Sequence, residues 1–366
     1  MSYKILAINP GSTSTKIAVY DDEKQLFTHT IDYPASKIAK YDKVMDQLDF
    51  RKESILEVLK EKEIDLRDMN AIVGRGGALP PVHSGAYEVN DLMVDVFQNR
   101  PTLEHASNLG GVIAKSLADM VGIKSYIYDP VTVNELSDVA KITGIPSIEK
   151  PCNGHALNTR AMALKYVKET GKDYNSLNII VAHVGGGSSV YLHNQGVMSD
   201  YSTDDDGPMS PQRSGRIPGA KLVELCFSGE HTKKEVLAMI RGKGGLVAHL
   251  GTADVREVES MINDGDEHAK LIYDAMLYQT AKSIGELATV VDGDVDVIII
   301  TGGIAYSKMF TSALMKKVEF ISEVVLMPGE NELEALAFGI LRVLRGEEKA
   351  SIFKEDEELS NSYSFA

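Results

Sequence analysis

The chain has 366 residues, a length that suggests two or three domains, and its content of 43% hydrophobic and 25% charged residues is typical of a globular protein. Its formal net charge is −15 at pH 7, so we expect its surface to repel nucleic acid and anionic membranes, and neither is a predicted partner. Two cysteines, Cys152 and Cys226, are too few for a disulfide framework or a zinc site.

Short apolar runs alternate with amphipathic runs along the chain, which indicates an α/β fold. The predicted strands are 4–8, 71–73, 125–128, 178–183, 295–301 and 324–327. The predicted helices are 54–63, 158–169 and 267–291, where apolar residues recur at helical spacing. The apolar run at 5–8 is too short for a secretion signal, and no run is long enough to span a bilayer, so the expected location is cytoplasmic.

Two segments repeat one pattern: an apolar run, a polar residue, a spacer and a turn rich in Gly and Ser. They are 5–14 and 179–188, and each continues into a second strand-like run, at 17–20 and 189–193. Two unrelated hairpins are the alternative, but their positions near the starts of two α/β halves favour a duplicated domain. We predict a first domain at 1–148, a second at 149–330 and a C-terminal segment, 331–366, that packs back on the first.

The turns of this repeat have the composition of phosphate-binding loops, because backbone amides in a tight Gly/Ser turn can face the same anion. A third Gly turn follows the predicted strand 295–301. The first turn is not a Walker A loop, since a strand and not a helix follows it. Plain hairpins with surface hydroxyls remain the alternative. The candidate phosphate-binding residues are Asn9, Gly11, Ser12, Ser14, Lys16, Gly185, Gly186, Gly187, Gly302, Gly303 and Ile304.

Nine motifs distributed over nearly the whole chain resemble the acetate kinase family, and within it the butyrate kinases. The motifs are Ile8–Lys16, Gly74–Gly77, Asp129–Val131, His155–Asn158, Ala182–Gly187, Ser210–Gly215, Gly242–Val247, Thr301–Ser307 and Pro328–Glu330. The family belongs to the superfamily of actin, sugar kinases and heat-shock ATPases. The resemblance implies two ribonuclease H-like domains with a nucleotide cleft between them.

The resemblance also implies an activity, the ATP-dependent phosphorylation of butyrate or a related short-chain or branched-chain fatty acid to an acyl phosphate, with Mg²⁺ and in a homodimer or larger homo-oligomer. An acetate or propionate kinase is one alternative. A sugar or alcohol kinase of the same superfamily is another, and it needs a carboxylate base such as Asp129. A non-catalytic nucleotide switch is a third, disfavoured because no appended substrate-binding domain is visible.

Arginines are the residues that this chemistry needs most, because a guanidinium binds carboxylate or phosphoryl oxygens with two parallel hydrogen bonds. A solvated surface charge is the usual role of an arginine, but Arg75 and Arg213 lie in loops rich in Gly and within two of the motifs that resemble the family, and we predict that both are catalytic. Arg216 lies in the same loop as Arg213, and the sequence does not distinguish a role in the site from a surface position.

The remaining site residues follow from the resemblance. It implies metal contacts at Asn9, Asp129 and Glu330, with Glu332 as the alternative to Glu330, and a catalytic role for Asp129. It implies that His155 and His183 lie near the transferred phosphoryl group, although His183 could equally be a core histidine. It implies an adenosine contact at Asp254, Val255 and Arg256, where helix capping is the alternative.

Two positions depart from the family pattern. Gly154 stands before His155, where a bulky apolar residue is usual, and Gln212 stands before Arg213, where Glu is usual. We expect these departures to affect substrate preference and rate rather than reaction class.

Overall fold

The fold is described from a computed structural model, which describes residues 2–152, 154–203 and 206–355. Two compact units make up the chain. Of the described residues, the first unit holds 2–134 together with 331–355, and the second holds those between 135 and 330. Each unit is built on its own β-sheet.

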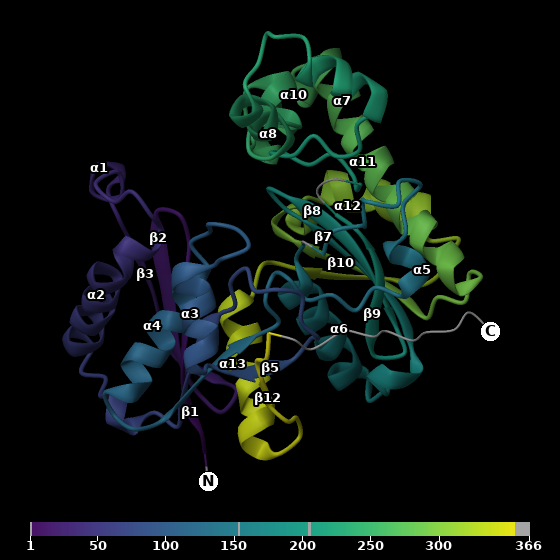
Figure 1. The fold of residues 1–366 in the computed structure, drawn as a ribbon. Helices are drawn as coiled ribbons and strands as arrows, with labels where there is room; N and C mark the ends of the chain where they lie inside the picture. The colour runs from purple at the N-terminus through teal and green to yellow at the C-terminus, as the bar shows by residue number, and fades with distance from the viewer. Residues whose placement is uncertain (1, 153, 204–205, 356–366) are drawn as a thin grey trace. The chain divides into compact units, whose positions relative to one another are not determined.

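The first unit contains a seven-stranded sheet in the order β12-β5-β6-β4-β1-β2-β3 (Figure 1). Its strands are β1 (Lys4–Pro10), β2 (Ser14–Asp21), β3 (Lys24–Asp32), β4 (Ala71–Arg75), β5 (Ala86–Glu88), β6 (Lys124–Tyr128) and β12 (Ser351–Ile352). Strands β1, β2 and β3 form an antiparallel meander, whereas β1, β4 and β6 are parallel. The carboxyl ends of these three parallel strands therefore lie at one edge of the sheet.

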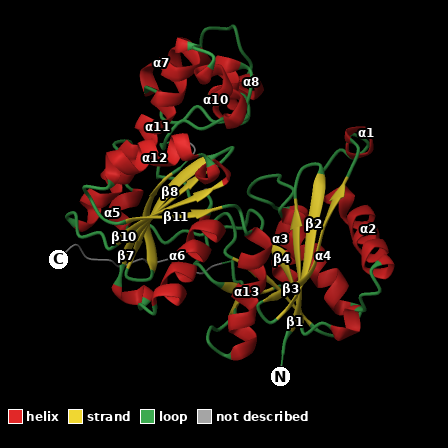
Figure 2. Ribbon diagram, turned by 180° about the vertical axis from the view of Figure 1, so that it is seen from behind, coloured by secondary structure: helices red, strands yellow, loops and turns green. Residues whose placement is uncertain are grey.

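Helices cover both faces of this sheet (Figure 2). They are α1 (Ala35–Ile38), α2 (Leu48–Glu61), α3 (Asp91–Asn99), α4 (Asn108–Asp119) and α13 (Glu332–Arg345). Leu6 and Ile8 of β1 form a core with apolar residues of α2 and α4, while α13 packs on the other face against β1, β4 and β6. Burial on both faces explains why these central strands read as continuous apolar runs.

The second unit repeats this plan with a five-stranded sheet in the order β11-β10-β7-β8-β9. Its strands are β7 (Asn178–Val184), β8 (Ser188–Asn194), β9 (Val197–Ser202), β10 (Val297–Gly302) and β11 (Val324–Pro328). Strands β7, β8 and β9 form an antiparallel meander, and β7, β10 and β11 are parallel. The order β6-β4-β1-β2-β3 in the first sheet thus corresponds to β11-β10-β7-β8-β9 in the second, as expected for a duplicated domain.

The helices of the second unit also lie on both faces of their sheet. They are α5 (Asp138–Lys141), α6 (Ala156–Thr170), α7 (Gly219–Cys226), α8 (Lys233–Ile240), α9 (Leu246–Leu250), α10 (Val255–Asn263), α11 (Glu267–Ala288) and α12 (Lys308–Val318). Helix α6 packs on Ile179 and Val181 of β7, whereas Ile180 and Ala182 join the core formed with α10, α11 and α12. Figure 1 shows α7, α8 and α10 grouped near one end of α11.

The boundary between the units differs from the predicted one after residue 148. The structure divides the chain between Asn134 and Glu135. The segment after Asn134 belongs to the second unit because Glu135 Oε2 accepts a hydrogen bond from Met198 N (2.9 Å) and Ser137 N donates to Ser199 O (3.0 Å). Pro146 and Pro151 lie within this segment and do not mark the boundary between the units. Of the C-terminal segment predicted to return to the first domain, residues 356–366 lie outside the described residues.

Candidate active site

Three predicted site residues lie at the carboxyl edge of the first sheet. Asn9 is near the end of β1, Arg75 ends β4, and Asp129 follows β6 directly. Ile8 pairs with Gly74 and Arg75 pairs with Tyr128, so the register brings all three residues to the same level of adjacent strands. This is the edge at which parallel α/β sheets bind their ligands.

Glu332, the first residue of α13, contacts two of these residues. Its Oε1 lies 2.6 Å from Arg75 Nη1, and its Oε2 accepts a hydrogen bond from Asn9 Nδ2. Arg75 Nη1 also lies 3.5 Å from Asn9 Oδ1. Glu330, the carboxylate preferred from sequence, belongs to the second unit, where its Oε1 lies 3.5 Å from His183 Nε2. Within the first unit, the structure therefore groups Glu332 with Asn9 and Arg75.

Asp129 has a strained backbone. Its φ of 39° lies in the left-handed region, and Pro130 follows it, a combination that is unfavourable for a residue with a side chain. The buried carboxylate accepts a hydrogen bond from Gly85 N (2.6 Å), and Asp129 N donates to Gly85 O (3.1 Å). Backbone strain held in place by such contacts is characteristic of functional sites.

The turn between β1 and β2, with Gly11, Ser12 and Ser14, is held from the protein interior by Arg51 of α2. This fully buried guanidinium donates to the carbonyl oxygens of Gly11 (2.8 Å), Ser14 (3.0 Å) and Ser12 (3.0 Å). Because the carbonyls point inward to Arg51, the shape of the turn is fixed by a charged group. Sequence reasoning missed this residue.

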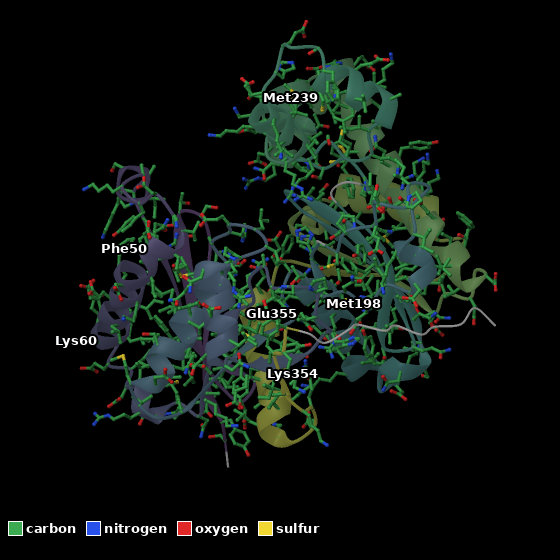
Figure 3. The ribbon with its side chains drawn as sticks, in the orientation of Figure 1. Phe50, Lys60, Met198, Met239, Lys354 and Glu355 are labelled. Carbon is green, nitrogen blue, oxygen red and sulfur yellow. The ribbon has the colours of Figure 1, made fainter. Side chains whose placement is uncertain are left out.

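An aromatic ring lies beside the Arg51 side chain. The guanidinium carbon lies 4.9 Å from the centroid of the Tyr33 ring. Phe50, labelled in Figure 3, lies on α2 next to Arg51, and its ring packs edge-on against Tyr33 with centroids 4.8 Å apart. Lys16 of β2, two residues after the turn, is exposed and pairs across the strands with Asn9.

The turn between β7 and β8 in the second unit contains Gly185, Gly186 and Gly187. The carbonyl oxygen of Gly186 accepts hydrogen bonds from Ser210 Oγ (2.9 Å) and Gln212 N (3.0 Å). In a trans peptide the N–H points opposite to the carbonyl, so the N–H of Gly187 is directed away from the loop that carries Ser210 and Gln212. A fixed amide of this kind is suited to an anion.

Two histidines and an arginine surround this turn. The rings of His155 and His183 are stacked, with centroids 4.0 Å apart and planes 12° apart. A Cβ on Gly187 would lie 3.3 Å from Arg213 Nε and 3.4 Å from His155 Cε1, and a Cβ on Gly185 would lie 3.1 Å from His183 Nε2. The structure thus brings together His155, His183, Arg213 and all three glycines of the turn.

The remaining nucleotide candidates of the second unit divide into two groups. Gly302 has a φ of 92° and pairs with Gly329, and a Cβ on Gly303 would meet no atom within 4 Å, so this turn leaves open space above β10. Ile304 is buried beside it. Asp254 caps α10 by accepting from Arg256 N (2.9 Å), and the Arg256 side chain is 89% exposed. Val255, the first residue of that helix, is buried.

The structure shows the surroundings of Arg216 and Gly154, whose roles the sequence left open. Arg216 donates to the Asp206 carbonyl oxygen and forms an ion pair with Glu286 (2.9 Å), so its guanidinium is engaged at the surface. A Cβ on Gly154 would lie 2.4 Å from Tyr191 Oη, so Tyr191 fills the space that the missing side chain leaves. Asn153, beside it, lies outside the described residues.

The donor set at the first sheet edge is compatible with magnesium. Mg²⁺ prefers oxygen ligands, takes few of them from protein and keeps several waters. Asn9 and Asp129 offer amide and carboxylate oxygens at neighbouring strand ends. Within residues 2–152, 154–203 and 206–355, no three His, Cys, Asp or Glu side chains gather closely enough to form a metal site by themselves.

Comparison with known proteins identifies the family. The family model described as the acetokinase family matches residues 155–335. A protein of Clostridium botulinum named "Probable butyrate kinase" is 50% identical over 355 residues, which cover 96% of this chain and 100% of that protein. This chain belongs to the acetokinase family. A second relative, "Butyrate kinase 2" of Clostridium acetobutylicum, is 48% identical over 97% of this chain and 100% of its own length.

Solved structures of an acetate kinase and a propionate kinase have the same fold. The acetate kinase of Porphyromonas gingivalis superposes with a TM-score of 0.76 at 19% identity, covering 92% of this chain and 99% of that one. A propionate kinase from Francisella tularensis gives a TM-score of 0.72 at 17% identity, with coverage of 92% and 98%. The predicted α/β fold class is confirmed.

Family membership also confirms the predicted reaction class. As a member of the acetokinase family the chain is an acyl kinase, an enzyme that transfers phosphate to a carboxylate. No helix in the described part of the chain is long and apolar enough to cross a membrane.

Proposed function

We propose that this acyl kinase transfers the γ-phosphoryl group of ATP to butyrate or a related short-chain or branched-chain fatty acid, giving the acyl phosphate and ADP. The observation that carries the proposal is the 50% identity to a probable butyrate kinase over 96% of the chain. A relative of much lower identity would support the reaction class but would not indicate which acid is the substrate.

The acceptor chemistry explains the type of residues in the site. A fatty acid carboxylate has a pKa near 4.3 and is already ionised at neutral pH, so it needs no general base. The difficulty is the approach of two anions, which cationic donors ease. In the first unit Arg75 is such a donor, and its contacts with Glu332 and Asn9 hold it at the sheet edge.

The second unit supplies groups for the phosphates. Arg213 and His155 both lie beside Gly187, and His183 lies beside Gly185. Amides of the Gly turn, the guanidinium and the ring N–H groups are all donors for phosphoryl oxygens. Asp254, Val255 and Arg256 lie at the start of α10, and we propose that the exposed guanidinium of Arg256 contacts the adenosine.

Asn9 and Asp129, with Glu332 next to Asn9, are the residues proposed to hold magnesium. Bound there, the ion would neutralise charge on the phosphate oxygens. Asn9 and Asp129 would hold the ion from the ends of β1 and β6, and the hydrogen bond from Gly85 N keeps the Asp129 carboxylate in place.

A panel of carboxylates tests the proposal. The purified chain is incubated with ATP, Mg²⁺ and each acid from acetate to isovalerate, and the acyl phosphate is trapped with hydroxylamine as a hydroxamate. We expect kcat/KM to be highest for butyrate or a branched neighbour. A maximum at acetate or propionate would favour that alternative, and phosphorylation of a sugar without any hydroxamate would overturn the proposal.

Two variants test the proposed catalytic arginines. Arg75→Ala and Arg213→Ala should abolish hydroxamate formation while circular dichroism and Tm show a folded protein. Arg256→Ala, a third variant in an exposed position, should instead raise KM for ATP. Normal turnover in both of the first two variants would contradict the assignment.

We also propose that the chain forms a homodimer or larger homo-oligomer. Helix α7 and the residue after it expose apolar side chains, with Val223 57% and Phe227 87% exposed. Exposed apolar residues that lie close together favour contact with another surface. Sedimentation of the wild-type chain and of Phe227→Glu tests this, and a wild-type monomer at micromolar concentration would contradict it.

A further inference from the structure

A chain of buried hydrogen bonds leads from the third Gly turn to His183. Asn158 of α6 places its Nδ2 at 2.8 Å from His183 Nδ1 and at 3.4 Å from Thr301 Oγ1. Thr301 lies beside His183 on the neighbouring strand, and its hydroxyl donates to Gly329 O (3.2 Å). Asn158, His183 and Thr301 are each 3% or less exposed, so water does not replace these contacts.

The direction of this chain can be deduced from its last member. Thr301 Oγ1 donates its single proton to Gly329 O, a carbonyl that can only accept and that also accepts from Gly302 N (3.2 Å). Toward Asn158, Thr301 Oγ1 therefore acts as an acceptor. The Asn158 group that faces Thr301 must then be the amide NH₂, and the same NH₂ faces His183 Nδ1.

The other end of the Asn158 amide supports this orientation. Among the described residues, Asn158 Oδ1 is buried without a hydrogen-bond partner. Turning the amide over would place two N–H donors there instead of one carbonyl oxygen. Two unsatisfied buried donors cost more than one unsatisfied acceptor, so the orientation with NH₂ toward His183 is favoured.

We infer that Asn158 and Thr301 are positioning residues that hold His183 as the neutral tautomer with its proton on Nε2. A ring nitrogen that accepts from Asn158 carries no proton, so the proton lies on the other nitrogen. Nε2–H is then a donor directed to the Gly185 side of the turn, 3.5 Å from Glu330 Oε1. With the opposite tautomer, Nε2 would present a lone pair to that carboxylate and to an incoming phosphate oxygen.

The stacked His155 ring makes the neutral state of His183 useful. With the two centroids 4.0 Å apart, charging both rings would place two cations face to face. A fixed Nε2–H supplies a donor without a second charge. The value of this donor for phosphoryl transfer rests on the proposed function, whereas the tautomer itself does not.

The experiment is a ¹H–¹⁵N correlation spectrum of the full-length protein labelled with ¹⁵N at its histidine rings, recorded where the rings are neutral. His183→Gln identifies the resonances of His183. We expect an unprotonated Nδ1 and a protonated Nε2 in the wild type. A proton on Nδ1, or rapid exchange between the tautomers, would overturn the inference.

Variants test the positioning residues by the same spectrum. Thr301→Ser keeps the hydroxyl and should keep the tautomer, whereas Thr301→Val frees the amide to turn and should give a mixture. Asn158→Asp replaces the donor by an acceptor and should place a proton on Nδ1. Asn194→Asp, at the end of β8, is the control and should leave the spectrum unchanged. An unchanged tautomer in both Thr301→Val and Asn158→Asp would contradict the inference.

Hydroxamate formation separates the inference from the proposed function. We expect kcat to fall about a hundredfold in Asn158→Asp, as when a fixed donor to a developing charge is lost, with a smaller effect on KM for the acid. A wild type with the expected tautomer that phosphorylates no fatty acid would overturn the proposed function alone. A fully active Asn158→Asp variant with the reversed tautomer would overturn the role of Nε2–H.

Discussion

The carboxylate of Glu332 lies 2.6 Å from the guanidinium of Arg75, at the point where the first turn of α13 meets the end of β4. The same carboxylate accepts from Asn9. One acidic residue from the C-terminal segment of the chain therefore orients a proposed catalytic cation and a proposed metal ligand that both come from the N-terminal part.

Glu332→Gln tests this orienting role. Glutamine keeps the length of the side chain but loses the charge that pairs with Arg75, so the variant should fold while kcat falls about tenfold to a hundredfold, as for other residues that orient ligands. The Mg²⁺ concentration for half-maximal activity should rise. Hydroxamate formation at several Mg²⁺ concentrations measures both quantities.

Two further variants control this prediction. Glu334→Gln lies in the same first turn of α13 and should leave both quantities near the wild-type values. Glu330→Gln lies in the second unit beside His183. A change in the Mg²⁺ requirement with Glu330→Gln, and none with Glu332→Gln, would show that the metal contact belongs to Glu330.

Asp129→Asn should separate the charge of Asp129 from its structural contacts. Asparagine tolerates the left-handed backbone better than most residues and can still accept from Gly85 N, so the Tm should stay close to that of the wild type. Loss of the negative charge should lower kcat at least tenfold. Asp129→Ala, which also loses the acceptor, should lower both kcat and Tm. A fully active Asp129→Asn would refute the metal assignment.

Much of the fold could be predicted from sequence because the central strands are buried on both faces. The predicted runs at 4–8, 71–73 and 178–183 fall inside β1, β4 and β7. Strand β3 was not predicted, since it lies at the sheet edge and most of its side chains are exposed, so it shows no alternation. Short strands such as β5 and β12 depend on their partners and carry little signal of their own.

The site could be predicted only where a residue type and its loop indicate the chemistry. The Gly turns and Arg213 lie in such loops, and Arg75 ends β4 directly before Gly76 and Gly77. The contact of Glu332 with Asn9 and Arg75 could not be predicted, because it depends on how α13 packs against β1 and β4. Arg51 was missed because the predicted helix began at residue 54, whereas α2 begins at Leu48. Its position one turn before Ile55 on the buried face was the available signal.

Arg51→Met should therefore destabilise the first unit. It removes a buried charged donor from three carbonyl oxygens of the β1–β2 turn, which should cost about 2–4 kcal/mol and lower the Tm by about 5–15 °C. Because the turn loses its shape, KM for ATP should also rise. Arg67→Met is the control, since its side chain is 79% exposed and pairs with Asp65 at the surface. Equal Tm values for the two variants would contradict the role of Arg51.

His193 of β8 is a buried titratable group outside the proposed site. Its Nδ1 lies 2.8 Å from Tyr174 Oη, and its Nε2 is buried without a hydrogen-bond partner in the described part of the chain. Burial disfavours the imidazolium and lowers the pKa of His193 from its usual value near 6.5 to about 3. The folded protein thus keeps this ring neutral at pH values where the unfolded chain protonates it.

This difference predicts how stability depends on pH. Between pH 6.5 and pH 3 the unfolded chain binds one more proton at His193 than the folded protein, so the free energy of unfolding falls as the pH falls, by up to about 1.4 kcal/mol per pH unit. Urea unfolding at several pH values measures this slope. His193→Gln should reduce the slope over the same window, whereas His29→Gln, at an exposed position on β3, should leave it unchanged. The same slope in His193→Gln and wild type would show that other groups produce the acid sensitivity.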